Sequence, residues 1–136
     1  MKREDFLYFN LNAGVSGDML IASLIDLGVP IEEIVKNRKL IDPKISIETK
    51  KVNRGPVQCT LLKPIFPDSL LNLEYSWEDL FSLIEPLKKN IDLYQNVKST
   101  LSLIKESEED IHGDEGNQPH EIGSIDTIFD IVGFYS

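Results

Sequence analysis

The spacing of apolar residues changes along this chain, and the changes predict most of its elements. The short apolar run Phe6–Phe9 is typical of a buried first strand. After a loop, apolar residues lie nearly all round a segment that starts near Ser16 and stops at Gly28, which predicts a buried helix. Pro30 follows this stop signal, and a second, short helix is expected over residues 30–35.

The next part of the chain predicts a β-hairpin. Apolar and polar residues alternate over 45–49 and again over 57–61, as they do in half-buried strands. Between them, residues 53–56 read Asn-Arg-Gly-Pro, which is a strong turn signal. Cys59 falls inside the second strand and is therefore expected to be a buried, inert thiol.

Three further helices are predicted in the second half. Ser76 can cap a helix that Pro86 should end or kink. A longer helix begins near Ile91 and stops at residues 112–113, and Ser124 can cap a last helix that runs to about Tyr135. The long helix carries one apolar stripe, made of Val97, Leu101, Ile104 and Ile111.

Together these elements predict an α+β fold, or a small α/β fold. The expected sheet is short, contains the hairpin and has three or more strands, and about five helices pack on it. The length of 136 residues fits a single domain over 1–136, and 41% apolar residues suffice for a core.

Charge and cysteine content exclude several classes of protein. The formal net charge of −9 argues against a nucleic-acid binder, which needs clustered cations. A single cysteine excludes a disulfide framework and a thiolate-rich zinc site. No apolar run reaches the roughly 20 residues that span a bilayer, and no signal peptide is recognisable, so a cytoplasmic protein without membrane contact is expected.

The first candidate site is the junction between loop and helix at residues 10–19. Gly14 and Gly17 permit positive φ or a close approach of a ligand, and free N–H groups at a helix start can bind an anion. Ser16 adds a hydroxyl group, whereas the charge of Asp18 opposes phosphate unless a metal bridges the two. The alternative is an ordinary glycine turn followed by a helix cap.

The second candidate is a pair of residues near the end of the long helix. Glu108 and His112 are four residues apart and share one helical face. A carboxylate and an imidazole so placed can bind a divalent metal or act as an acid–base pair. The alternative is a salt-bridged or half-exposed pair at a frayed helix end.

The third candidate is the segment from His120 and Glu121 into the last helix. Asp126 and Asp130 are four residues apart among apolar neighbours, where two like charges are costly unless a cation or a proton pairs with them. Two aspartates on an exposed polar face are the alternative. Oxygen donors with one or two imidazoles suit Mg, Mn, Ni or Zn and do not choose among them.

At these sites the sequence resembles a family of nickel-insertion proteins, which load nickel into pyridinium-3,5-bisthiocarboxylic acid mononucleotide, the pincer cofactor of lactate racemase. The resemblance lies in Asn10–Met19, with its Gly-Val-Ser-Gly-Asp-Met run, in Glu108–Gly113, and above all in the long stretch His120–Gly133. The family's proteins are much longer, so the chain is similar to their N-terminal domain and lacks the C-terminal, nucleotide-using part.

The resemblance implies CTP-dependent insertion of nickel into the cofactor precursor, with Mg or Mn accompanying the CTP. The expected partners are then an anionic mononucleotide and a C-terminal domain or subunit of the same family. Assembly into a homo-oligomer is neither predicted nor excluded. Two alternatives remain: a non-catalytic domain for nickel delivery or assembly, and a metal-dependent hydrolase. The residues are assigned as hypotheses: phosphate or cofactor binding to Gly14, Ser16, Gly17 and Asp18; catalysis to Asp18, Asp126 and Asp130; metal binding to Glu108, His112, His120 and Glu121.

The chain departs from the family pattern at three places. Asn10 stands where the family's first motif begins with Asp, and Gln118 stands where a second histidine is common. The stretch Leu70–Ser76 contains no histidine, although many members carry a histidine-rich segment there. Each departure removes a charge or a metal donor, so nickel capture by this chain alone is put in question.

Overall fold

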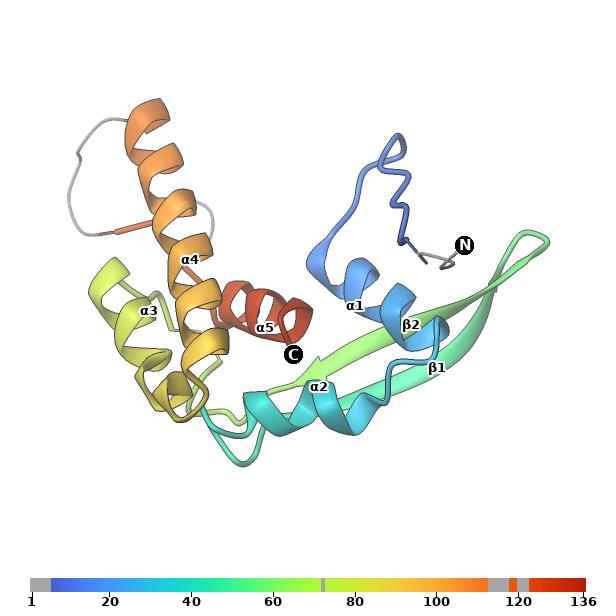
Figure 1. The fold of residues 1–136 in the computed structure, drawn as a ribbon, viewed down its shortest axis with the longest axis horizontal. Helices are drawn as coiled ribbons and strands as arrows, with labels where there is room; N and C mark the ends of the chain where they lie inside the picture. Colours follow the sequence, from blue (N-terminus) through green and yellow to red (C-terminus); the bar gives the residue numbers. More distant parts are fainter. Residues whose placement is uncertain (1–5, 72, 113–117, 120–122) are drawn as a thin grey trace, which may run out of the picture.

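The computed structural model describes residues 6–71, 73–112, 118–119 and 123–136, with the side chain of His112 left out. These residues form an α+β fold, as predicted, with five α-helices, one 3-10 helix and a two-stranded antiparallel sheet (Figure 1). None of these helices is long and apolar enough to cross a membrane. The elements are α1 (Gly17–Asp26), α2 (Ile31–Arg38), β1 (Ser46–Arg54), β2 (Val57–Ile65), α3 (Trp77–Leu83), η1 (Glu85–Lys89), α4 (Ile91–His112) and α5 (Ile125–Phe134).

Local signals fix the helix ends close to their predicted places. Ser76 caps α3 through a reciprocal capping box with Asp79, in which each side chain binds the other residue's backbone N–H. Gly28 ends α1 with a φ of 103°, a conformation that suits glycine. Ser124 and Ser16 precede α5 and α1 as predicted, but neither makes a side-chain capping bond.

The predicted hairpin is confirmed, and so is the apolar face of its first strand, since Ile45 is buried and Ile47 packs against the core. The second strand, however, buries the face opposite to the predicted one. β1 and β2 pair without interruption from Arg54↔Val57 to Ser46↔Ile65. Leu62 is buried with 4% of its surface exposed, while its neighbour Leu61 is 44% exposed. Because α1 packs on the Leu62 side of β2, Cys59 points to the opposite face, and the prediction of a buried thiol is wrong: it is only half-buried.

The predicted first strand does not form. Residues 6–10 have no regular structure, and Phe6 is 90% exposed. An apolar run becomes a strand only where a neighbouring strand satisfies its backbone groups. Within the described residues β1 and β2 pair only with each other, so the expectation of three or more strands is also wrong.

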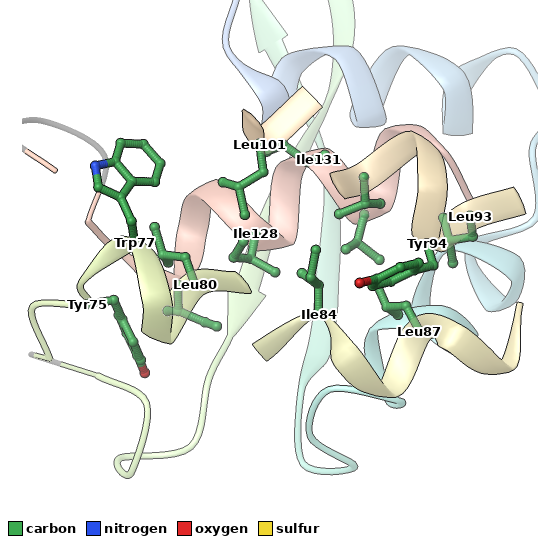
Figure 2. Close-up of a cluster of buried hydrophobic side chains, with 13 residues drawn as sticks. Tyr75, Trp77, Leu80, Ile84, Leu87, Leu93, Tyr94, Leu101, Ile128 and Ile131 are labelled. Carbon is green, nitrogen blue, oxygen red and sulfur yellow. The ribbon is translucent and has the colours of Figure 1, made fainter. Parts of the chain in front are cut away.

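Helix α5 lies at the centre of the structure and joins two hydrophobic clusters (Figure 1). It contacts α1 and α2 on one side and α4 on the other. Ile128 and Val132 belong to a larger cluster with α3, η1 and the first half of α4, part of which Figure 2 shows. Phe129 belongs to a smaller cluster with α1, α2 and the hairpin. The last helix therefore docks back on this chain.

Two predictions about helix faces are corrected. The apolar stripe of α4 is buried at Val97 and Leu101, but Ile111 is 76% exposed because the end of α4 projects beyond the cluster that covers its first half (Figure 1). Helix α1 is not buried all round: Ile21 and Ala22 are covered, whereas Met19 and Leu27 are exposed. Only one face of α1 meets α5 and β2.

A buried arginine links α2 to α5. Arg38 has 0% of its surface exposed, and its Nε and Nη2 donate hydrogen bonds of 3.1 and 3.0 Å to the carbonyl oxygen of Phe129. Its guanidinium carbon lies 3.6 Å from the centroid of the Phe129 ring, a cation–π arrangement. A Cβ on Gly133 would lie 1.6 Å from Nη2, so the arginine fits only because residue 133 has no side chain.

We therefore expect Gly133→Ala to destabilise the protein. The added methyl group forces Arg38 or α5 to move, and overpacking of a core of this kind costs about 1–3 kcal/mol. Urea denaturation followed by circular dichroism measures the free energy of unfolding. Ser99→Ala, at an exposed position of α4, is the control and should change that free energy by less than about 0.5 kcal/mol. Equal stability of the two variants would contradict the proposed packing.

Candidate functional site

Two of the sequence motifs meet where the first turn of α1 packs against α5. A Cβ on Gly17 would lie 2.3 Å from the carboxyl carbon of Asp130, so the absence of a side chain at residue 17 is what admits the aspartate. Residues 17 and 130 come from the first and the last motif. The fold thus brings together Asp18, Asp126 and Asp130, and we call these three residues the acidic junction.

The acidic junction is electrostatically strained. Burial, together with the charges of Asp18 and Asp126, raises the pKa of Asp130 to about 6, against the opposing effect of Arg38. Burial and the charge of Asp18 also raise the pKa of Asp126. The buried arginine is therefore a counter-charge that only partly compensates the three carboxylates.

Asp18 is held by its own neighbours. Its Oδ1 accepts a hydrogen bond from the hydroxyl of Ser16 and another, of 2.9 Å, from the backbone N–H of Met19. Ser16 thus orients the carboxylate instead of capping the helix. These bonds fix Asp18 at the start of α1, where the helix dipole also favours a negative charge.

The charge of the junction bears on the predicted anion site at residues 14–18. Gly14 has a φ of 82° in an exposed turn, and its N–H donates to the carbonyl of Leu11 at 3.0 Å. Three carboxylates beside the helix start repel a free phosphate and attract a cation. The predicted phosphate binding stays a prediction, and it requires a cation between the carboxylates and the phosphate.

The predicted metal ligands lie mostly outside what the structure describes. His120, Glu121 and the side chain of His112 are not among the described residues, and Glu108 is half-buried near the end of α4. Among the described residues, no group of three or more His, Cys, Asp or Glu side chains is arranged to hold a metal ion. The four metal assignments therefore stay predictions, and the acidic junction by itself is not a complete coordination shell.

Sequence reasoning missed Arg38 and Gly133, although the chain carries a signal for the arginine. Arg38 follows Ile31, Ile34 and Val35 at the spacing of one apolar helix face, so it occupies a position that normally faces the core. A charged residue at such a position predicts a buried counter-charge or a buried carbonyl partner. Here it has both, in Asp130 and Phe129.

Comparison with known proteins identifies the family. The model of the family described as nickel insertion protein matches residues 7–136, and the chain belongs to this family. A family relative from Dictyoglomus thermophilum is 32% identical over 134 residues, and one from Geobacter sulfurreducens is 31% identical over 132 residues. A relative from Staphylococcus saprophyticus, 28% identical over 130 residues, is named pyridinium-3,5-bisthiocarboxylic acid mononucleotide nickel insertion protein.

The chain corresponds to only part of these relatives. Each match covers 93% of this chain but only 33–34% of the relative, so the chain spans about a third of the length of the curated relatives that it matches. No solved structure matches the chain.

The raised pKa of Asp130 predicts a specific pH dependence of stability. Because the folded-state pKa of about 6 lies above the ordinary value of 3.8, this carboxyl stabilises the fold fully below about pH 4, and the contribution is lost as the pH rises through 6. Asp130→Asn mimics the protonated form. The unfolding free energy of the variant relative to wild type should therefore increase by about 1–2 kcal/mol between pH 4 and pH 7, after allowance for solvent screening.

Denaturant titrations at several pH values measure this difference. The matched control is Asp110→Asn, which removes an exposed carboxylate near the end of α4 and should leave the pH profile parallel to that of wild type. A parallel profile for Asp130→Asn as well would show that this carboxyl does not titrate abnormally.

Proposed function

We propose that this member of the nickel insertion protein family takes part in inserting nickel into pyridinium-3,5-bisthiocarboxylic acid mononucleotide, with the acidic junction as a transient site for the metal. The observation that carries the proposal is the meeting of Asp18, Asp126 and Asp130 at a junction where the pKa of Asp130 is about 6. Nickel is here the substrate that is delivered, and no stable metal centre is required.

The electrostatics favour an exchange of a proton for a cation. A carboxylate whose pKa is raised by neighbouring carboxylates is repelled by them, and binding of either a proton or a divalent cation removes this repulsion. Arg38 is fully buried and offsets only part of the negative charge, so the remaining charge is available to a cation that approaches from solvent. Carboxylate oxygens also bind nickel less tightly than imidazole or thiolate groups do, which suits a metal that must be passed on.

Further ligands are proposed from the sequence. His120 and Glu121 precede α5 by only a few residues, and with Glu108 and His112 they are the proposed nitrogen and oxygen donors that complete the nickel site. Asp126 and Asp130 then act as ligands or as acceptors of hydrogen bonds from ligands. The turn at Gly14 and the start of α1 are proposed to hold the phosphate of the mononucleotide through a bridging cation.

The same carboxylates suit the chemistry of insertion. Forming a bond between nickel and a ring carbon that bears hydrogen releases one proton, and an acceptor with a pKa near neutrality can take it up at physiological pH. Asp130 is the residue proposed for this role. CTP with Mg or Mn is proposed as a further requirement, which the remaining two-thirds of the family protein would serve.

A second candidate function is delivery of nickel without catalysis. It is favoured by the extent of the match, since the chain covers only 33% of the Dictyoglomus relative. In that case this chain binds the metal or the partner, and the chemistry takes place elsewhere in the family protein. Turnover of the precursor by the chain alone distinguishes insertion from delivery.

Isothermal titration of the chain with nickel tests the site itself. Because binding displaces a proton from a group with a pKa of about 6, affinity should fall about tenfold between pH 7.5 and pH 5.0. Asp130→Asn should weaken binding at pH 7.5 and remove most of the dependence on pH, and His120→Ala should weaken binding throughout. Asp110→Asn is the control and should bind as wild type does.

Adding the mononucleotide precursor and CTP to the same samples separates the candidate functions. Nickel binding with formation of a nickel-loaded product supports insertion, whereas nickel binding without product supports delivery. Absence of nickel binding in wild type, together with no effect of His120→Ala, would falsify both. Hydrolysis of phosphate esters with Mg or Mn would support a metal-dependent hydrolase instead.

A further inference from the structure

The outer side of α1 carries an unusually apolar surface. Two open grooves of about 480 and 400 Å³ lie along it, the first between α1 and the segment 7–11 and the second between α1 and the hairpin. Met19 lines both grooves, so they form one continuous surface. We call this surface the α1 face and define it by Leu7, Tyr8, Met19 and Leu27.

The exposure of these side chains is too large to be incidental. Tyr8 is 78% exposed, Leu27 66% and Met19 56%, and all three line the same groove. Isolated apolar residues at a surface are ordinary, but contiguous apolar surface of this kind marks an interface. The carboxylate beside it, Asp26, is paired with Lys51, and Arg54 lies at the hairpin end of the second groove. The part of the α1 face along the first groove is therefore suited to an apolar partner.

The segment before α1 supports the same conclusion. Residues 6–9 have the composition of a buried strand and yet form no strand, and Phe6, Leu7 and Tyr8 have exposed side chains. Within the described residues the sheet consists of β1 and β2 alone. An apolar, strand-forming segment without a neighbour is completed most directly by a strand or sheet surface from another part of the protein.

The family supplies that other part. The chain covers 33% of the Dictyoglomus relative and 34% of the Geobacter relative, so about two-thirds of each family protein lies outside the match. We infer that the α1 face is the docking surface for this remaining two-thirds, whether it is joined to this chain or is a separate subunit. The inference rests on family membership and on apolar exposure, and it holds whether or not the acidic junction binds nickel.

The position of the α1 face gives docking a consequence for the site. Gly17 and Asp18 begin α1, and Met19, which follows them directly in the same turn, lines both grooves. A partner seated on the α1 face thus lies beside the first turn of α1, which also carries Asp18 of the acidic junction. It is placed to contribute the donors that the described residues lack.

The experiment compares this chain alone with a full-length protein in which it replaces the matching third of the Dictyoglomus relative. Hydroxyl-radical labelling reads the solvent exposure of individual side chains. Tyr8, Met19 and Leu27 should be labelled strongly in the chain alone and at least fivefold less in the full-length protein. Leu103 and Ile111, exposed on α4, are internal controls and should be labelled equally in both.

A matched pair of substitutions tests the same surface by stability. Met19→Asp should leave the Tm of the isolated chain nearly unchanged, because Met19 is exposed there, and should lower the Tm of the full-length protein by several degrees. Leu103→Asp should leave both unchanged. Light scattering of the isolated chain completes the experiment by measuring its oligomeric state.

Three results would overturn the inference. The first is equal labelling of Met19 in the two proteins. The second is loss of stability of the full-length protein with Leu103→Asp but not with Met19→Asp, which would place the interface on α4. The third is a dimer of the isolated chain that Met19→Asp dissociates, which would make a second copy the occupant. None of these outcomes depends on nickel, so they are independent of the titrations that test the proposed function.

Discussion

The structure depends on the burial of one charged side chain, the guanidinium of Arg38. Removing such a group from water is costly unless its donors are satisfied and a counter-charge is near. The Phe129 carbonyl satisfies two of its donors, the Phe129 ring lies against its face, and the charge of Asp130 acts on it. Burial lowers the pKa of Arg38 to about 9, which still leaves it charged at neutral pH. All three compensating groups lie on α5, so the arginine determines where α5 must lie relative to α2.

The acidic junction follows from this constraint. With α5 fixed by Arg38, Asp130 faces the start of α1, and Gly17 leaves the space that its carboxyl occupies. The single positive charge of Arg38 then faces three carboxylates, and the pKa of Asp130 is raised to about 6. Glycines at 17 and 133 are thus needed for one purpose: each allows a charged side chain to approach a helix more closely than any Cβ would permit.

Periodicity in the sequence was sufficient to predict α4, α5 and the hairpin, because these elements are long or are bounded by strong turn residues. It could not predict which side of β2 is buried, since Leu61 and Leu62 are adjacent and the choice depends on where α1 packs. It also could not show that the apolar run at 6–9 lacks a partner strand, because pairing is a property of the whole sheet. The close packing of Asp130 against Gly17 joins residues from nearly opposite ends of the chain, and no local sequence pattern predicts this contact.

Helix α1 links the two surfaces that matter for function. Its first residues, Gly17 and Asp18, form one side of the acidic junction, while Met19 and Leu27 belong to the α1 face. Its last residue, Asp26, is fixed to the hairpin by Lys51 and Thr60, whose bonds lower the pKa of that carboxyl. A helix held at its C-terminal end by polar bonds and along one side by Ile21 has little freedom to slide. Its first turn thus holds Asp18 at the acidic junction and Met19 at the α1 face in fixed relative positions.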